Sequence, residues 1–425
     1  MIDLLRIAIP FSESFVAGDT SAEKPSGLVD LKECSLRGAR LESGDVIFND
    51  GQFDVDQLRH PYESLPSSWS TLSFKIHAGG STYWPFVELK ASPAKLLQGH
   101  NVFGSDNIRL CVEALITTFN MGMPRLAEML DYYSAEIKQI DVTFTSHLES
   151  ESMARNTIDA LRNLSSGQTR SSKSSHDTTV YWGTKNSNGG RAASRHKQLK
   201  AYLKHFELEK SIRDAKSNYE KTKKEVFQRQ LSAMTDPEVI AFSKNSLRFE
   251  ASVMPRMLKR LGFPLRVGDF VEHCEVMSKR HCPIQYLWNL SWQDIFQTFE
   301  GKDVNIYNDD EVRELLRAEF HTVGKSGKVS FSKADRLFRF IRSLKSEGWE
   351  EVKETTSEST FYRNIQEITS VIPKSFLMNL QANAASNVVP LVRFINVDFS
   401  RQHPKNWQEP KPLYMQLREG LRAVS

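Results

Sequence analysis

The feature that most constrains the fold is a change of pattern along the chain, from strands mixed with helices to helices alone. In residues 137–147, "IKQIDVTFTSH", polar and apolar side chains alternate with the period of two that is typical of a β-strand. Helical patterns lie between such strands, but without the regular alternation of a βαβ protein. We therefore expect an α+β fold in which helices surround an antiparallel sheet. Further strands are predicted at residues 72–80 and 83–91, joined as a hairpin, and at residues 178–183, 197–208 and 246–254. Helices are predicted at residues 107–133, with a break near Gly122 and Pro124, and at residues 209–234.

After about residue 290 the pattern is helical, which predicts a mainly helical C-terminal domain. We place the boundary near Gly301, giving domains at residues 1–300 and 301–425. Residues 349–368 read as two short helices joined by a tight turn, as in a helix-turn-helix. The second helix of that motif meets base edges and phosphates near its N-terminus, so Tyr362 and Arg363 are candidate DNA contacts. A helical hairpin without a DNA function is the alternative.

The composition is that of a globular protein, with 40% hydrophobic and 25% charged residues. No run approaches the roughly 20 apolar residues that cross a bilayer, so we expect no membrane contact. Acidic Asp3 and Glu13 lie where a signal peptide would be basic, and the four cysteines are scattered. These features predict a protein of the cytoplasm.

Positive charge is concentrated in one segment. Between Arg155 and Glu225 there are 16 Lys and Arg against 7 Asp and Glu, a net charge of +9 in a chain whose total is +4. Cations in this number can neutralise phosphates, so the segment predicts a nucleic-acid partner, and a solvated basic loop is the alternative. The candidate DNA contacts in the segment are Arg170, Lys173, Arg195, Lys197 and Lys200.

Three acids lie in otherwise apolar strands: Glu88, Asp141 and Glu250. A carboxylate in such a place is costly to desolvate unless it is paired or binds a cation. If the three strands are neighbours, their oxygens suit Mg²⁺ or Mn²⁺. The alternative is that each acid forms a salt bridge, for example Glu250 with Arg248.

A tyrosine in the basic segment is a candidate nucleophile. If residues 197–208 form one strand, Lys200, Tyr202, Lys204 and Phe206 share a face. The two lysines could then lower the pKa of the phenol and hold a phosphodiester against it. An ordinary half-buried tyrosine is the alternative.

Several long strings of the chain are distinctive: "HPYESLP", "VELKASPAKLLQGHNVFG", "RNLSSGQTRSSKS", "AYLKHFEL", "IPKSFLMNL" and "NVVPLVRFINVDFS", together with the opening "MIDLLRIAIPF". These strings resemble the gene II replication initiators of filamentous phages. The resemblance runs through nearly the whole chain. It implies a rolling-circle replication initiator that acts in the host bacterial cytoplasm.

Such an initiator binds the origin of the double-stranded replicative form and nicks the viral strand by a transesterification that needs a divalent cation. The resemblance also implies a 5′-phosphotyrosine intermediate, extension of the 3′ end by the host polymerase, and later cleavage and circularisation of the displaced single strand. The host helicase is a further expected partner. The resemblance leaves open an oligomer on the DNA. Where the family starts a separate C-terminal product at an internal Met, this chain has Val304.

The order of an acid, a Tyr-x-Lys and an Arg-x-Glu on successive strands also resembles plasmid rolling-circle initiators. That resemblance implies Tyr202 as nucleophile, with Asp141 and Glu250 at the metal. Glu88, the third acid in an apolar strand, is the candidate third ligand. Lys204 would steady the phosphate or phenolate. Tyr181 is the rival nucleophile.

His100 and Asn101 either line the site or close a turn. The competing interpretation of the whole chain is a DNA-binding repressor or protecting protein without enzymatic activity.

Overall fold

The computed structural model describes residues 1–20, 25–43, 46–49, 52–55, 58–162, 178–183, 194–296, 309–323, 327, 329–372, 377 and 397–416. Gly301, Val304, Arg170 and Lys173 lie outside these residues. No described helix is both long enough and apolar enough to span a membrane.

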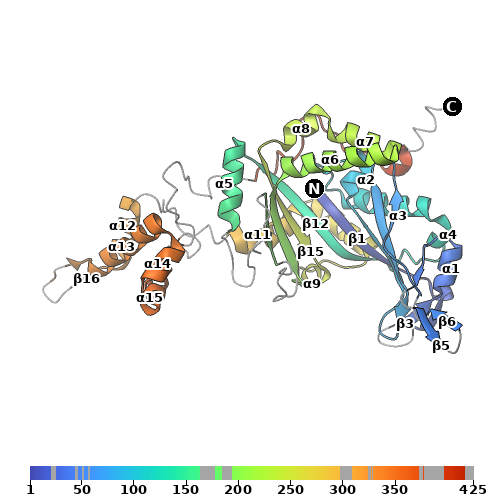
Figure 1. Ribbon diagram of the computed structural model, residues 1–425, viewed down its shortest axis with the longest axis horizontal. Helices are drawn as coiled ribbons and strands as arrows, with labels where there is room; N and C mark the ends of the chain where they lie inside the picture. Colours follow the sequence, from blue (N-terminus) through green and yellow to red (C-terminus); the bar gives the residue numbers. More distant parts are fainter. Residues whose placement is uncertain are drawn as a thin grey trace.

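One antiparallel sheet of eight strands organises the larger unit (Figure 1). Its order is β13-β14-β15-β12-β1-β11-β9-β8, so strands far apart in sequence are neighbours. The longest strand, β12, lies between β15 and β1 near the middle. The bounds are β1 Ile2–Pro10, β8 Glu63–Pro66, β9 Thr71–His77, β11 Phe86–Ala91, β12 Glu136–His147, β13 Thr179–Trp182, β14 Lys197–Leu203 and β15 Ser246–Val253.

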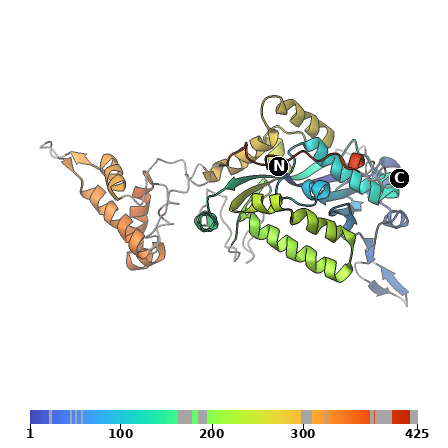
Figure 2. The ribbon, with the colours of Figure 1, turned by 90° about the horizontal axis from the view of Figure 1, so that it is seen from above.

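The two faces of the sheet differ because side chains alternate along each strand. The apolar face carries residues such as Leu89, Ile140 and Phe249, all fully buried in the main core. Helices α3, α10 and α11 pack on this face, while α6 and α7 lie on the other side of the sheet (Figure 2). The helices of this unit are α1 Leu31–Leu36, α2 Pro93–Gln98, α3 Ile108–Gly122, α4 Pro124–Ala127, α5 Glu151–Arg162, α6 Lys204–Thr222, α7 Glu225–Met234, α8 Pro237–Ser243, α9 Pro255–Arg260, α10 Val267–Ser278 and α11 Pro283–Phe296.

Short elements decorate the sheet. A 3-10 helix spans Glu13–Phe15. In the small sheets, β3 Ser26–Val29 pairs with both β2 Val16–Asp19 and β10 Gly79–Gly80, β4 Glu42–Ser43 pairs with β7 Leu58–Arg59, and β5 Val46–Asn49 pairs with β6 Gln52–Val55.

The C-terminal helices form a second core of their own. They are α12 Asp309–Glu319, α13 Ser332–Glu347, α14 Trp349–Thr355 and α15 Glu358–Ile368, with a hairpin of β16 Thr322–Val323 and β17 Val329–Ser330. Side chains such as Leu337, Ile341 and Phe361 are fully buried among these helices. In both views the helices lie to one side of the sheet (Figures 1 and 2).

Residues 397–416, which the sequence prediction assigned to the C-terminal domain, pack against the sheet unit instead. The ring centroid of Phe399 lies 4.9 Å from that of Phe144. The Gln402 side chain bonds both backbone groups of Thr145, and His403 Nε2 lies 2.8 Å from the carbonyl oxygen of Gly104. The last described residues therefore return to the first unit.

The expected α+β fold is confirmed, and two predicted elements are corrected. The strand predicted at residues 197–208 ends at Leu203, where α6 begins with Lys204, so Lys204 and Phe206 are helical. The helix predicted at residues 209–234 is two helices, because Lys223 adopts a left-handed conformation (φ 54°) that ends α6.

Candidate active site

The predicted nucleophile and two of the predicted acids lie on the polar face of the sheet. Tyr202 on β14 pairs in register with Arg248 on β15, and Lys200 pairs with Glu250. Across the next ladder, Asp141 on β12 pairs with Ser252, which makes it a diagonal neighbour of Glu250. Alternation along the three strands therefore brings these groups to one face, as the sequence predicted.

A third acid, Asp3, comes from a β-bulge that sequence reasoning missed. The register of β1 against β12 shifts between Ile2 and Leu4, so Asp3 is the extra residue. Its buried carboxylate accepts a hydrogen bond of 2.8 Å from Asn101 Nδ2. The available signal was the same as for Asp141, an acid within an apolar strand, in "MIDLLRIAI".

Two acids of this cluster, Asp141 and Glu250, are buried without a full counter-charge, so their pKa values are raised. Burial and then the charge of Glu250 raise the pKa of Asp141 to about 8. Burial also raises the pKa of Glu250, against the opposing effect of Lys200, whose Nζ lies 3.5 Å from its carboxylate. Gln139 donates a hydrogen bond of 2.8 Å to Asp141 Oδ1. Carboxyl oxygens are the ligands that a hard divalent cation prefers, and these carboxyl groups lack a full cationic partner in the protein.

Glu88 is placed elsewhere. It lies on β11, with β1 between it and β12. Its carboxylate forms an ion pair of 2.9 Å with Arg6 and accepts a hydrogen bond of 2.6 Å from the Tyr62 hydroxyl. Burial would raise the pKa of Glu88, but these two partners lower it. Within the described part of the chain, no group of three or more His, Cys, Asp or Glu is arranged to hold a metal ion.

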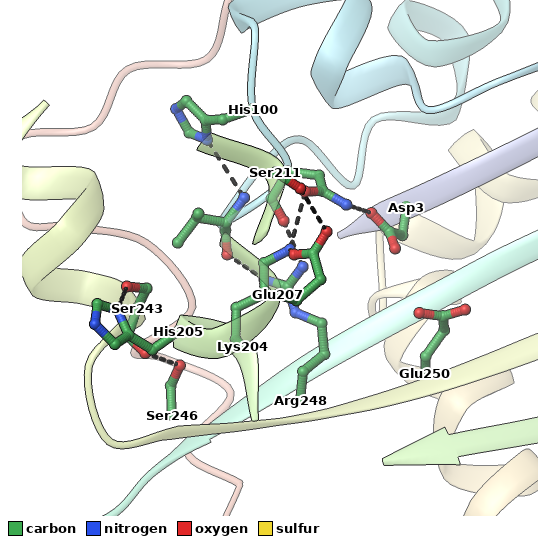
Figure 3. A network of polar contacts seen from close by, with 12 residues as sticks. Asp3, His100, Lys204, His205, Glu207, Ser211, Ser243, Ser246, Arg248 and Glu250 are labelled. Carbon is green, nitrogen blue, oxygen red and sulfur yellow. Dashed lines mark hydrogen bonds and ion pairs between the residues drawn. The ribbon is translucent and has the colours of Figure 1, made fainter. Parts of the chain in front are cut away.

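A buried polar network borders the cluster (Figure 3). Lys204, the first residue of α6, donates to Asn101 Oδ1 at 2.9 Å and to Glu207. The guanidinium of Arg248 donates to the backbone carbonyls of Asn101 and Val102. Asn101 therefore joins Asp3 to Lys204, so it contributes to the site as well as to a turn.

Burial and charge coupling shift the pKa values of Lys204 and Glu207. Burial lowers the pKa of Lys204 to about 8. Burial alone would raise the pKa of Glu207, but Lys204 beside it lowers the value to about 2. His100 is buried, its pKa is lowered to about 4 by burial and nearby cations, and its Nδ1 accepts from the amide of Val102. We interpret His100 as closing the turn.

Tyr202 lies between two lysines but is buried. Lys200 Nζ is 4.0 Å and Lys204 Nζ 5.8 Å from its ring centroid, and only 3% of the residue is exposed. Burial raises the pKa of the phenol well above its usual value, so the expectation that the lysines lower it is wrong for this conformation. The rival Tyr181 pairs with Lys200 from β13, so it lies on the same face but one strand farther from Asp141.

The remaining predicted DNA contacts that the structure describes are either exposed or already bonded within the protein. Arg195 is exposed, whereas Lys197 Nζ is engaged within the protein, at 2.7 Å from both the Ser291 carbonyl and Asp294. Tyr362 and Arg363 are exposed near the start of α15. Thr356 and Ser357 separate α14 from α15, so two successive short helices are present as predicted, and their contact with DNA stays a prediction.

Sequence comparisons link the chain to phage replication proteins. Residues 1–277 match the N-terminal family of the gene II replication-associated protein, and residues 323–413 match the C-terminal family of the same protein. The chain is 40% identical over 415 residues to the replication-associated protein of Enterobacteria phage fd, covering 96% of this chain and 99% of that protein. It is 39% identical over 427 residues to that of Salmonella phage IKe, covering 97% of each. No solved structure matches.

Proposed function

Because the chain belongs to the gene II replication-associated protein family of filamentous phages, we propose that it initiates rolling-circle replication of a phage genome. It binds the origin of the double-stranded replicative form, nicks the viral strand, and later cleaves and joins the displaced single strand. The reaction takes place in the host cytoplasm, where the host polymerase extends the 3′ end of the nicked strand and the host helicase is a further partner.

One observation carries the catalytic part of this proposal: Tyr202 shares a sheet face with Lys200, Glu250 and Asp141. A protein that only binds DNA gains nothing from burying two carboxyls without full neutralisation, since such burial costs stability. A nucleotidyl-transfer enzyme needs this combination of a nucleophile, cations for the phosphate and oxygen ligands for a metal.

The nick is a transesterification. Tyr202 Oη attacks the phosphorus of the scissile linkage, the P–O3′ bond breaks, and the phenolic proton is transferred to the departing 3′ oxygen. The products are a 3′ hydroxyl and a 5′-phosphotyrosyl ester. Because the pKa of the free phenol is raised, charge develops on Oη only as the phosphate enters, and Lys200 and Lys204 stabilise that charge.

Asp141 and Glu250 would hold the cation, Mg²⁺ or Mn²⁺, and the charge of Asp3 acts on both of them. When bound, the cation supplies Lewis-acid polarisation of the phosphodiester. The phosphotyrosyl ester retains the energy of the broken linkage, so attack by a 3′ hydroxyl reverses the chemistry and closes a circle without ATP.

A nicking assay on a supercoiled plasmid that carries the phage origin tests the proposal. Tyr202→Phe should abolish nicking and the covalent protein–DNA product, while Tyr181→Phe, the matched control on the neighbouring strand, should retain both. Asp141→Asn and Glu250→Gln should remove cation-dependent nicking but leave origin binding.

Peptide mapping of the trapped covalent product identifies the nucleophile independently. Modification at Tyr181 would reject Tyr202, and undiminished nicking by Asp141→Asn and Glu250→Gln would reject the metal site. Tight origin binding with no cleavage across a panel of divalent cations would favour the repressor or protecting protein instead.

A further inference from the structure

The polar face of the sheet continues beyond the catalytic cluster, over β1, β11 and β9. Gln139, which bonds Asp141, pairs in register with Arg6, and Arg6 pairs with Lys90 on β11. On β9, Ser73 then pairs with Lys90. The row from β15 to β9 crosses four strand spacings of about 4.8 Å, or about 19 Å.

Aromatic rings and cations alternate on this part of the face. The Tyr62 side chain reaches Glu88, is 52% exposed, and has Lys75 Nζ 5.2 Å from its ring centroid. The ring of Phe86 stacks on that of His77 at 4.3 Å. We call the set Arg6, Tyr62, Lys75, His77, Phe86 and Lys90 the aromatic-basic platform.

The charge of the platform is net positive. Its acid, Glu88, is buried and neutralised by Arg6. Neighbouring Glu136 is paired with Lys138 at 2.6 Å. Neither Lys75 nor Lys90 forms an ion pair with any residue that the structure describes, so both cations are available to a partner.

We propose that the aromatic-basic platform binds single-stranded DNA next to the scissile linkage and leads that strand into the catalytic cluster. The exposed ring of Tyr62 can stack on an unpaired base, which a closed duplex does not offer, beside the half-buried pair of Phe86 and His77, and the interleaved cations follow the phosphates. The proposal rests on the proposed function, and it gives the enzyme a surface that selects the unpaired strand.

Binding can be measured separately from chemistry in the Tyr202→Phe background. Fluorescence anisotropy with a labelled 20-nucleotide strand spanning the nick site, and with the blunt duplex of that sequence, gives both affinities. Tyr62→Ala should weaken single-strand binding about 5- to 100-fold, while Tyr62→Phe, which keeps the ring, should bind like the parent. Tyr286→Ala is the control, an exposed tyrosine on α11 at the apolar side of the sheet.

The salt dependence of binding tests the cations. Lys90→Gln should reduce the slope of log affinity against log salt by about 0.7 for the single strand. Lys279→Gln, at the exposed end of α10, should leave that slope unchanged.

Three results would overturn the platform. They are parental binding by both Tyr62→Ala and Lys90→Gln, an equal loss in Tyr62→Phe and Tyr62→Ala, or an equal loss for duplex and single strand. If Tyr62→Ala and Lys90→Gln bind DNA like the parent but no longer support replication of the phage genome in cells, the platform would instead contact a host protein. Nicking is measured separately, in protein that keeps Tyr202. A failure of the platform proposal can therefore be distinguished from a failure of the proposed function.

Discussion

The buried guanidinium of Arg248 supports the loop formed by residues 98–104, and its removal gives the sharpest stability prediction. Arg248 is 1% exposed and donates to the carbonyls of Asn101 and Val102. Hydrogen bonds from a charged donor contribute about 1.5–3 kcal/mol each, so the two together contribute about 3–6 kcal/mol. Removing a buried charge offsets part of this loss. We expect Arg248→Met to lower the free energy of unfolding by about 3 kcal/mol.

Urea unfolding followed by tryptophan fluorescence measures this change, because Trp182, Trp288 and Trp292 are buried in the core of the sheet unit. The melting temperature should fall by roughly 5–10 °C. Nicking should fall as well, since Asn101 binds both Asp3 and Lys204.

The matched control is Arg266→Met. Arg266 also donates two hydrogen bonds, at 2.7 and 2.6 Å to Asp269, but on the surface, where solvent screening weakens the pair. Its loss should change stability far less. Equal unfolding free energies for Arg248→Met and Arg266→Met would refute the reasoning that burial makes the Arg248 contacts strong.

Two further predictions concern the same loop and its network. Gly99→Ala should destabilise the protein by about 2 kcal/mol, because Gly99 has φ +83° and an added Cβ would lie 2.8 Å from the Ala233 Cβ. Gly262→Ala, at φ +81° with nothing within 4 Å, should cost only about 1 kcal/mol, and equal melting temperatures would exclude the contact with Ala233. Glu207 has a folded-state pKa of about 2 against 4.5 ordinarily, so its ionised form stabilises the fold above pH 4.5 and that contribution is lost as the pH falls toward 2. The stability advantage of wild type over Glu207→Gln, about 2 kcal/mol at pH 7, should therefore shrink below pH 4.5 in unfolding titrations, and an advantage constant down to pH 3 would contradict the lowered pKa.

The strands and the faces of their side chains follow from the sequence alone. The predicted strands at residues 137–147 and 246–254 are confirmed as β12 and β15, and the hairpin partners at residues 72–80 and 83–91 as β9 and β11. The predicted helix break near Gly122 is also confirmed between α3 and α4. These features depend on local alternation and on backbone preferences, which a single sequence displays directly.

The end of a strand was harder to predict than its presence. "AYLKHFEL" alternates well enough to continue as a strand, yet the chain becomes helical at Lys204. There Lys204 turns away from the ladder and meets Asn101 and Glu207. Tertiary packing of α6 decides this boundary, and the local pattern does not contain it.

Which acids meet was decided only by the order of strands in the sheet. Alternation places Glu88, Asp141 and Glu250 on the same face of the sheet. However, β1 lies between β11 and β12, so Glu88 forms an ion pair with Arg6 and does not reach the other two acids. The bulge in β1 adds Asp3 to the neighbourhood of Asp141. The alternation of side chains determines the side of the sheet on which a carboxylate lies. Its neighbours depend on contacts between segments far apart in the chain, and local sequence does not encode those contacts.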